Sequence, residues 1–331
     1  MNNFTFVIFE VTIMSNLPKR YDRATLVKIS DLYYMHGLTQ QEISDIAHIH
    51  RTEISRILKA ARDEGVVSIA INPETTAVSQ LVDFFKQKYG LRDAVIVPAS
   101  ENGGNELNAL SVYASMFLSK IIKSDDVIGL SWGSTLSSVI SQFPTDKKLH
   151  DIKVVPLVGG PMGRIPSNYH VNYLTHRLAN RLNGTAFVLD SPAFVRSKAL
   201  RKELLANPNT QEILSLWTRV NIAIFGMGSS LITDSPDWQA FYENTNFKSY
   251  FSAEMVGDIL SHPFDKSGKV TRDIDSILVA LPLSALKKVP YSVGIAFGED
   301  KVTAILAALR GGLLNTLITT EATAKSIKDL S

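Results

Sequence analysis

Two short helical patterns joined by a tight turn constrain the fold of this chain more than any other segment. Residues 39–62 read TQQEISDIAHIHRTEISRILKAAR. Thr39 and Glu42 have the spacing of a capping box, in which each side chain binds a free N–H group at the start of a helix. Apolar residues then recur at helical intervals through both halves of the segment. The side chains predicted to be buried are Ile43, Ile46, Ala47, Ile49, Ile54, Ile57, Leu58 and Ala61.

The second of these helices carries basic and hydroxyl side chains on its outward face, which is the layout of a helix-turn-helix DNA reader. Side chains near the start of such a helix reach base edges, and later basic side chains meet phosphates. The residues predicted to bind bases are Arg51, Thr52 and Ser55, those predicted to bind phosphates are Arg56, Lys59 and Arg62, and Thr39 and Gln40 complete the DNA-binding set.

Two observations leave a plainer interpretation open, namely a helical hairpin with a solvated basic face. Residues 14–66 hold eight Lys and Arg against seven Asp and Glu, a net charge of +1. Non-specific affinity for DNA should therefore be modest, and dimerisation would strengthen it. His50 also occupies the expected N-cap of the second helix, where Ser or Thr is more usual. A helix over Arg23–His36, ended by Gly37, is predicted upstream.

The chain as a whole suits two domains. Its 331 residues allow one small domain and one with a sizeable core. The absence of cysteine excludes disulfide scaffolds and thiolate metal sites and fits a cytoplasmic location. The first 13 residues are apolar but too short to span a membrane, so we expect a disordered extension there. The predicted divisions are 1–13, 14–72 for the DNA-binding domain and 73–331 for an effector-binding and oligomerisation domain, with a wing or first link at Val66–Ile71.

Short apolar runs alternate with helical patterns from Asp93 onward, which predicts an α/β fold with a doubly wound, mostly parallel sheet. The predicted strands are Ala94–Pro98, Asp126–Leu130, Lys153–Leu157, Thr185–Leu189, Ile222–Phe225, Ser276–Ala280, Ser292–Ala296 and Thr316–Thr319. The predicted helices among them include Leu107–Ile122, Ser134–Gln142, Tyr169–Leu182 and Lys301–Arg310.

Glycine and hydroxyl residues gather where these strands should end, and open sheets of this kind bind ligands beyond the carboxyl ends of their strands. VIGLSWGSTL (127–136) runs from strand through a Gly/Ser turn into a helix, which makes a natural anion site. Loops at 154–163, 222–230 and 295–301 follow three other strands, and the last carries a lysine. Together they favour a phosphorylated polar ligand. None matches the P-loop or dinucleotide spacing.

The chain resembles the SorC family of sugar-responsive bacterial transcriptional regulators from about Asp22 to Lys328. In the predicted DNA-binding domain (14–72), called the head below, the segments LYYMHGLTQQEIS and RTEISRILKAARDEGVVSIAIN are similar to the family's DNA-binding region. GLSWGSTL, PLVGGPMG, YHVNYLTHRLA, IAIFGMGS, VGDI…FD..G and GIAFGEDK…AILAALRGG are similar to its sugar-binding signatures, in the family's order. Among its members, the sorbose operon regulators look most alike.

This resemblance implies a winged helix-turn-helix head and an effector domain related to phosphosugar isomerases. It also implies a homo-oligomer, commonly a tetramer, whose hold on double-stranded operator DNA changes when a sugar phosphate binds. By motif, Gly133, Ser134 and Thr135, with Gly159 and Gly160, would cradle the phosphate. Asp258 in VGDI and Lys301 in GEDK would contact the sugar or its phosphate. The predicted effector-binding residues are Trp132, Gly133, Ser134, Thr135, Gly159, Gly160, His170, Gly228, Asp258 and Lys301.

Histidine and tryptophan have alternative interpretations here. We predict no metal site, because the seven histidines lack convergent carboxylates at ligand spacing. His170 could line the sugar pocket or simply be a partly buried histidine at a helix start. Trp132 could stack on a sugar face or belong to the core. We also predict no cofactor and no membrane partner.

Three functions remain possible at this stage. The first is an effector-gated transcription factor, either repressor or activator. The second is a sugar-phosphate isomerase or deaminase with an accessory head, with Glu254, Asp258 and Lys301 as acid–base groups. The third is a polyol-binding module without DNA function. The helix-turn-helix pattern favours the first.

Overall fold

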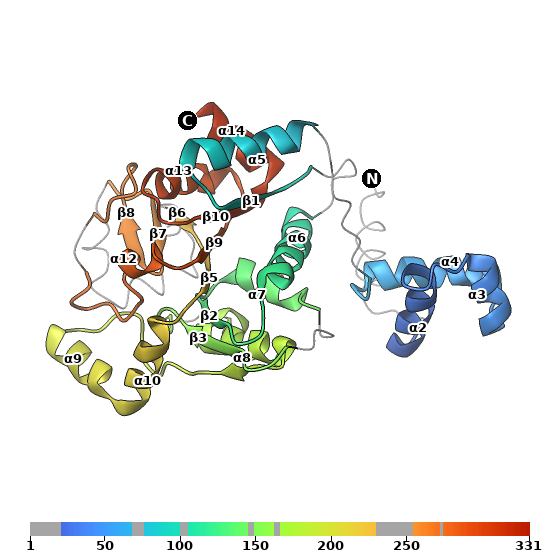
Figure 1. The fold of residues 1–331 in the computed structure, drawn as a ribbon, viewed down its shortest axis with the longest axis horizontal. Coiled ribbons are helices and arrows are strands. Elements are labelled where there is room, and N and C mark those ends of the chain that lie inside the picture. Colours follow the sequence, from blue (N-terminus) through green and yellow to red (C-terminus); the bar gives the residue numbers. More distant parts are fainter. Residues whose placement is uncertain are drawn as a thin grey trace, which may run out of the picture. The chain divides into compact units, whose positions relative to one another are not determined.

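Two compact units, residues 1–71 and 72–331, make up the chain. The computed structural model describes residues 21–67, 76–99, 105–144, 149–161, 166–229, 254–271 and 274–331 (Figure 1). The predicted extension over 1–13, the predicted domain seam at 72–73 and most of the predicted wing fall outside the described residues.

The described part of the first unit forms three helices: α2 (Arg23–Tyr34), α3 (Gln40–Ala47) and α4 (Arg51–Asp63). The capping box of Thr39 and Glu42 is present as predicted, with each side chain bound to the other residue's backbone N–H. Gly65, with φ of +69°, follows the end of α4. A single apolar cluster joins the three helices through the buried residues Leu26, Ile29, Ile43, Ile54, Ile57, Leu58 and Ala61.

The prediction that Ile46 is buried is wrong, since its side chain is 58% exposed. Helix α3 has only two turns, and it packs through Ile43 and the half-buried Ala47, which share one stripe at a spacing of four residues. Around the helix, Ile46 and Ala47 lie on opposite sides of Ile43. Ile46 therefore falls outside this narrow buried stripe.

A seven-stranded, fully parallel sheet organises the second unit, in the order β1-β10-β9-β5-β2-β3-β4 (Figure 1). The chain runs outward from β2 to the β4 edge and then returns to place β5 on the other side of β2. That reversal makes the β5–β2 junction a topological switch point. The strands are β1 (Asp93–Val97), β2 (Val127–Leu130), β3 (Lys153–Pro156), β4 (Thr185–Ala186), β5 (Ile222–Gly226), β9 (Tyr291–Ile295) and β10 (Thr316–Thr320).

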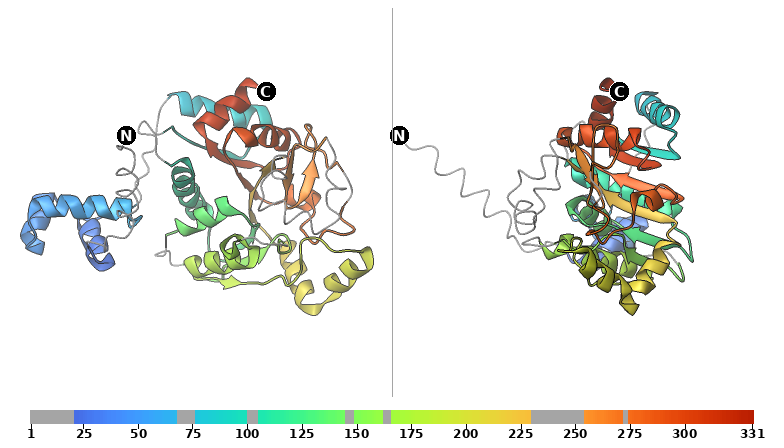
Figure 2. Two further views of the ribbon diagram at one scale, coloured as in Figure 1. Left: turned by 180° about the vertical axis from the view of Figure 1, so that it is seen from behind. Right: turned by 90° about the vertical axis from the view of Figure 1, so that its left-hand side faces the viewer.

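Helices cover both faces of this sheet, which confirms the doubly wound prediction (Figure 2). Successive strand residues point to opposite faces. Ile128 and Ile224 pack with α6, α7 and α8, whereas Val127 and Phe225 pack with α5, α10, α13 and α14. The helices among the described residues of this unit are α5 (Thr76–Tyr89), α6 (Glu106–Ile121), α7 (Ser134–Ser141), α8 (Val171–Leu182), α9 (Lys198–Ala206), α10 (Pro208–Trp217), α12 (Leu283–Leu286), α13 (Val302–Arg310) and α14 (Glu321–Asp329).

Two predicted strands differ from the structure. The strand expected over 185–189 ends at Ala186, because the Asn172 side chain binds both backbone groups of Leu189 (3.2 Å each) in place of a neighbouring strand. The segment 276–280 forms only isolated bridges, from Leu278 to Phe194 and from Ala280 to Val158. Its partners there are irregular segments, so no ladder extends.

A small antiparallel sheet, β6-β7-β8, accompanies the large one. Its strands are β6 (Gly228–Ser229), β7 (Gly257–Ile259) and β8 (His262–Phe264). Leu260 and Ser261 turn the chain between β7 and β8 with φ of 50° and 64°, the left-handed pair that a two-residue hairpin requires. Throughout the described residues, no helix combines the length and hydropathy needed to cross a bilayer.

Candidate functional site

The outward face of α4 is exposed along its whole length. Arg51, Thr52, Ser55, Arg56, Lys59 and Arg62, the six side chains predicted to contact DNA from this helix, are all exposed. The buried residues of α4 lie on the opposite side and anchor the helix in the core of the first unit. Thr39, Gln40 and Arg51 line one open groove, together with Tyr33 and the Gly37–Leu38 turn. The structure therefore brings predicted residues of α3 and α4 to one concave surface.

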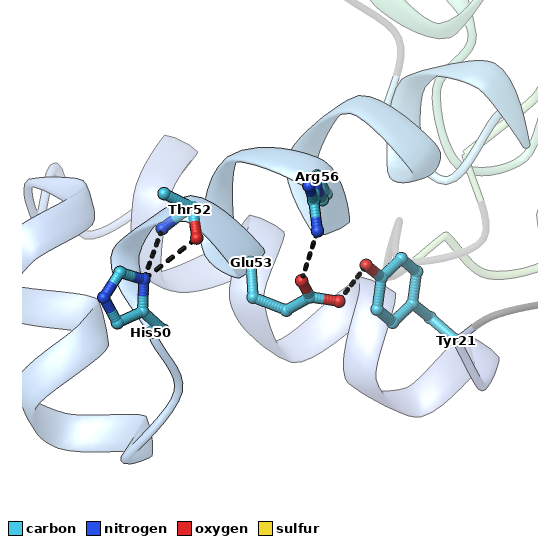
Figure 3. A network of polar contacts seen from close by, with 5 residues as sticks. All are labelled: Tyr21, His50, Thr52, Glu53 and Arg56. Carbon is cyan, nitrogen blue, oxygen red and sulfur yellow. Dashed lines mark hydrogen bonds and ion pairs between the residues drawn. The ribbon is translucent and has the colours of Figure 1, made fainter.

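His50 caps α4 despite being an unusual residue for that position. Its Nδ1 accepts a hydrogen bond from the N–H of Thr52 at 3.4 Å and lies 2.9 Å from Thr52 Oγ1 (Figure 3). The imidazole thus replaces the hydroxyl that usually satisfies a free N–H in the first turn.

Two of the basic side chains on α4 are held by neighbours. Arg56 Nη1 lies 3.2 Å from Glu53 Oε2, and Glu53 also accepts a hydrogen bond from the Tyr21 hydroxyl (Figure 3). Arg62 Nη1 donates to the Tyr34 hydroxyl at 3.0 Å, which ties the end of α4 to α2. These contacts orient both guanidinium groups before any phosphate binds.

A cavity of about 310 Å³ lies at the carboxyl ends of β2, β5 and β9, in the second unit. This is the switch point of the sheet, where ligands bind in open α/β folds. Seven of the ten predicted effector-binding residues line it: Trp132, Gly133, Ser134, Thr135, Gly228, Asp258 and Lys301.

Helix α7 begins at this cavity. Ser134, Thr135 and Leu136 form its first turn, whose N–H groups have no partner within the helix, and Gly133 at the N-cap supplies no side chain to satisfy them. Gly133 has φ of +134°, a conformation in which a side chain would be strained. The helix start therefore presents free N–H donors and the positive end of its dipole to the cavity, which suits an anion.

Lys301 also lines the cavity and has two polar neighbours. Its Nζ lies 3.3 Å from Ser229 Oγ and 3.5 Å from Asp300 Oδ2. Ser229 Oγ in turn donates to Asp300 at 3.3 Å. Lys301 is the only lysine or arginine among the described lining residues, so it is the cation available there to a negatively charged ligand.

Asp258 and Ser261 place buried polar atoms in the cavity wall. Asp258 Oδ1 and Ser261 Oγ are both inaccessible and have no hydrogen-bond partner, although each residue lines the cavity. Burial raises the pKa of Asp258, while the Lys301 charge and a hydrogen bond from the Ser261 N–H oppose that shift. An unpaired buried polar atom costs about 1–3 kcal/mol, so a ligand that supplies partners would recover free energy here. Ser261 was missed by the sequence analysis, because its place depends on the left-handed hairpin turn.

Gly159, Gly160 and His170 are not among the described residues that line this cavity. The N–H groups of the two glycines already donate at 2.8 Å, to Val279 O and Ser191 O respectively. His170 packs with its Nε2 against Gly160, and its Nδ1 caps α8 by accepting from the Asn172 N–H at 3.2 Å. Burial lowers the pKa of His170, which favours this neutral, accepting form. The structure thus places His170 at a helix start, and the three residues support the loop behind the cavity.

Two other sets of polar residues have members away from the cavity. Of the three acid–base candidates, Glu254 is exposed and does not line the cavity. Among the described residues, Asp125, His150 and Asp151 could offer three metal ligands within 4.8 Å of one another, but all three are exposed. They precede β2 and β3 and so lie at the amino ends of these strands, whereas the cavity lies at the carboxyl ends.

Comparison with known proteins places this architecture. A family model described as "Putative sugar-binding domain" matches residues 74–328. Over 308 residues, the chain is 34% identical to the sorbitol operon regulator of Klebsiella pneumoniae, covering 92% of this chain and 97% of that protein. The chain belongs to the SorC family. The transcriptional regulator LsrR of Escherichia coli O9:H4 (strain HS) is 29% identical over 311 residues, covering 91% of this chain and 93% of that protein.

Solved structures agree with this SorC-family assignment. The crystal structure of the full-length sorbitol operon regulator SorC from Klebsiella pneumoniae aligns with a TM-score of 0.77 and 33% identity, covering 93% of this chain and 99% of that one. A transcriptional regulator from Streptococcus pneumoniae TIGR4 aligns with a TM-score of 0.72 and 27% identity, covering 77% and 98%. A match over 93% of the chain includes the head, so the chain is a regulator with a DNA-binding head and a sugar-binding domain. These relatives are named as regulators and not as enzymes, which argues against the isomerase or deaminase alternative.

Proposed function

We propose that this SorC-family regulator controls a carbohydrate or polyol utilisation operon and that a phosphorylated sugar bound in the cavity switches its hold on operator DNA. The observation that carries the proposal is the composition of the cavity wall. The α7 start and Lys301 suit a phosphate, whereas the unpaired Asp258 and Ser261 atoms suit sugar hydroxyls. A ligand with both groups matches these polar features of the wall.

The cavity's place in the sheet supports a role in signalling. Loops from β2, β5 and β9 and the β7–β8 turn all meet there, so a ligand that bridges them would favour one arrangement of these segments. A difference in ligand affinity between two arrangements shifts DNA affinity by the same coupling free energy, typically about 1–3 kcal/mol.

We further propose that the regulator acts as a homo-oligomer in the cytoplasm, with paired α4 helices reading two half-sites. The near-neutral head supports this proposal, because a net charge of +1 gives little non-specific affinity to a single copy. Light scattering of the purified chain tests the oligomeric state. A monomer at every concentration would contradict it.

The switch is tested by mobility-shift titration of DNA from upstream of the protein's own gene, with and without sugar and polyol phosphates. The panel includes the phosphates of sorbose and of sorbitol, since a relative is named for a sorbitol operon. The unphosphorylated compounds are the matched controls. A shift altered by one phosphate, but not by its parent compound, supports the proposal and names the effector. A shift indifferent to all of them contradicts the effector site, and no shift at any concentration contradicts the operator assignment.

A further inference from the structure

His50 and Thr52 form a hydrogen-bonded pair on the exposed side of α4 (Figure 3). Both the Thr52 N–H, at 3.4 Å, and the Thr52 Oγ1, at 2.9 Å, are directed to the same ring nitrogen, His50 Nδ1. Thr52 lies on the side of α4 opposite to the buried Ile54, Ile57 and Ala61, where it is exposed.

The backbone fixes the direction of these two hydrogen bonds. A backbone N–H only donates, so the Nδ1 that receives it must carry a lone pair and no proton. The Thr52 hydroxyl can therefore approach the same nitrogen only as a donor. Its single hydrogen is then committed to His50, and its oxygen has lone pairs alone to offer on the exposed side.

We propose that His50 is a positioning residue that fixes Thr52 as a hydrogen-bond acceptor, so that Thr52 selects a base with an amino group in the major groove. Only cytosine N4 and adenine N6 donate there, whereas guanine and thymine present acceptors on their major-groove edges. A free threonine hydroxyl rotates to suit either kind of base. The Thr52 hydroxyl that is bonded to His50 cannot rotate in this way, because its hydrogen is already committed. This inference rests on the proposed reading of operator DNA by α4.

Capping alone does not require this pairing, which makes the two roles of His50 separable. Glycine at an N-cap is only a few tenths of a kcal/mol worse than the preferred residues, but it has no side-chain acceptor. Asparagine caps well, and its Oδ1 accepts hydrogen bonds as Nδ1 does. H50G should thus keep the helix and free the Thr52 hydroxyl, while H50N should keep both the helix and the restraint.

The test is in vitro selection of operator sequences by the full chain from a randomised library, followed by competition binding at each base pair. We expect one position at which the wild type prefers cytosine or adenine by about 2- to 12-fold, the worth of one hydrogen bond. T52V should abolish that preference, H50G should relax it, and H50N should retain it.

Three outcomes would overturn the proposal. These are an unchanged preference in H50G, a uniform loss of affinity for every sequence in H50G, and a wild-type preference for guanine or thymine at the position that T52V affects. A wild type that selects no sequence at all would instead contradict the proposed operator reading. Circular dichroism of H50G and H50N, compared with the wild type, checks that both variants keep the head folded.

Discussion

The α4 face and the cavity hold their polar groups in opposite states. On α4, Arg56, Arg62 and Thr52 are exposed, and each is already bonded to a neighbour in the head. In the cavity, Asp258 and Ser261 are buried and each has an atom without a partner. Water and salt screen the first set, so each contact there contributes little. The second set lacks that screening, so each missing or added partner has a large effect. The comparison predicts large effects of cavity variants and small effects of head variants.

Removal of the Lys301 ammonium should produce the largest effect. A hydrogen bond to a charged group is worth about 1.5–3 kcal/mol, so Lys301→Ala should weaken binding of a phosphorylated effector by roughly 10- to 150-fold. DNA affinity without effector should not change, because Lys301 lies in the second unit. Isothermal titration calorimetry measures the first quantity and mobility shift the second.

Lys325→Ala is the matched control for this variant. Lys325 pairs with Glu321 on the surface of α14, at 2.7 Å, and is 58% exposed. It should bind the effector as the wild type does. Equal effector affinity in the two variants would show that Lys301 does not bind the effector. It would also contradict the expectation that cavity variants have larger effects than head variants.

At neutral pH, Asp258→Asn should stabilise the protein without effector and weaken its affinity for the effector. Burial raises the pKa of Asp258 above its unfolded value, and Lys301 only partly opposes this. The stability that this carboxyl contributes is therefore fully present below an unfolded pKa of about 3.9 and is lost as the pH rises through the higher folded pKa. The neutral amide avoids that loss, so we expect a higher free energy of unfolding at pH 7.

Thermal unfolding between pH 4 and 8 measures this effect. The wild type should lose more stability than Asp258→Asn as the pH rises across that range. Asp265 is the matched control, because hydrogen bonds from Ser267 and Lys269 lower its pKa, so its contribution has the opposite sign. Asp265→Asn should destabilise the protein at neutral pH. Parallel pH profiles for wild type and Asp258→Asn would show that Asp258 is not an unpaired buried charge.

The sequence predicted those parts of this contrast that depend on local patterns. The capping box, the buried stripe of α4 and the α/β alternation each follow from the spacing of a few neighbouring residues. The strand-end pattern indicated Lys301, and the motifs that carry the family resemblance then assigned both Asp258 and Lys301 to the ligand. They are 43 positions apart in the sequence, and no local pattern brings them together.

Contacts between distant segments account for what the sequence did not predict. Gly159 and Gly160 were predicted to bind the effector, but their N–H groups donate to Val279 O and Ser191 O, which lie far along the chain or in an irregular loop. The unpaired Ser261 hydroxyl depends on a hairpin turn with two positive φ angles at non-glycine residues. The residue types at these positions, Leu260 and Ser261, do not predict such a turn. Burial of a polar atom without a partner is a property of the assembled wall.

Two substitutions on α4 separate base reading from phosphate binding. Lys59→Ala should weaken binding to all DNA sequences alike and reduce the slope of log affinity against log salt by about 0.9, the value for one phosphate. Arg51→Ala should instead relax sequence preference, with the slope nearly unchanged. Binding to operator and random DNA at several salt concentrations distinguishes the two. A sequence-dependent loss in Lys59→Ala, or unchanged affinity in both variants, would contradict the assignment of this face.

Glu53→Gln should produce the smallest effect, and its sign is informative. Glu53 holds the Arg56 guanidinium at 3.2 Å, and Arg56 is 60% exposed. A phosphate must compete with this carboxylate, whose exposed pair is worth only about 0.2–1 kcal/mol. The neutral amide should therefore raise affinity for random DNA by less than about 5-fold, mostly at low salt. The double variant Glu53→Gln with Arg56→Ala should lose that gain. A weaker affinity in Glu53→Gln alone would contradict this expectation. The loss would then come from the fold of the head, which the hydrogen bond from Tyr21 to Glu53 stabilises, and not from the charge of the carboxylate.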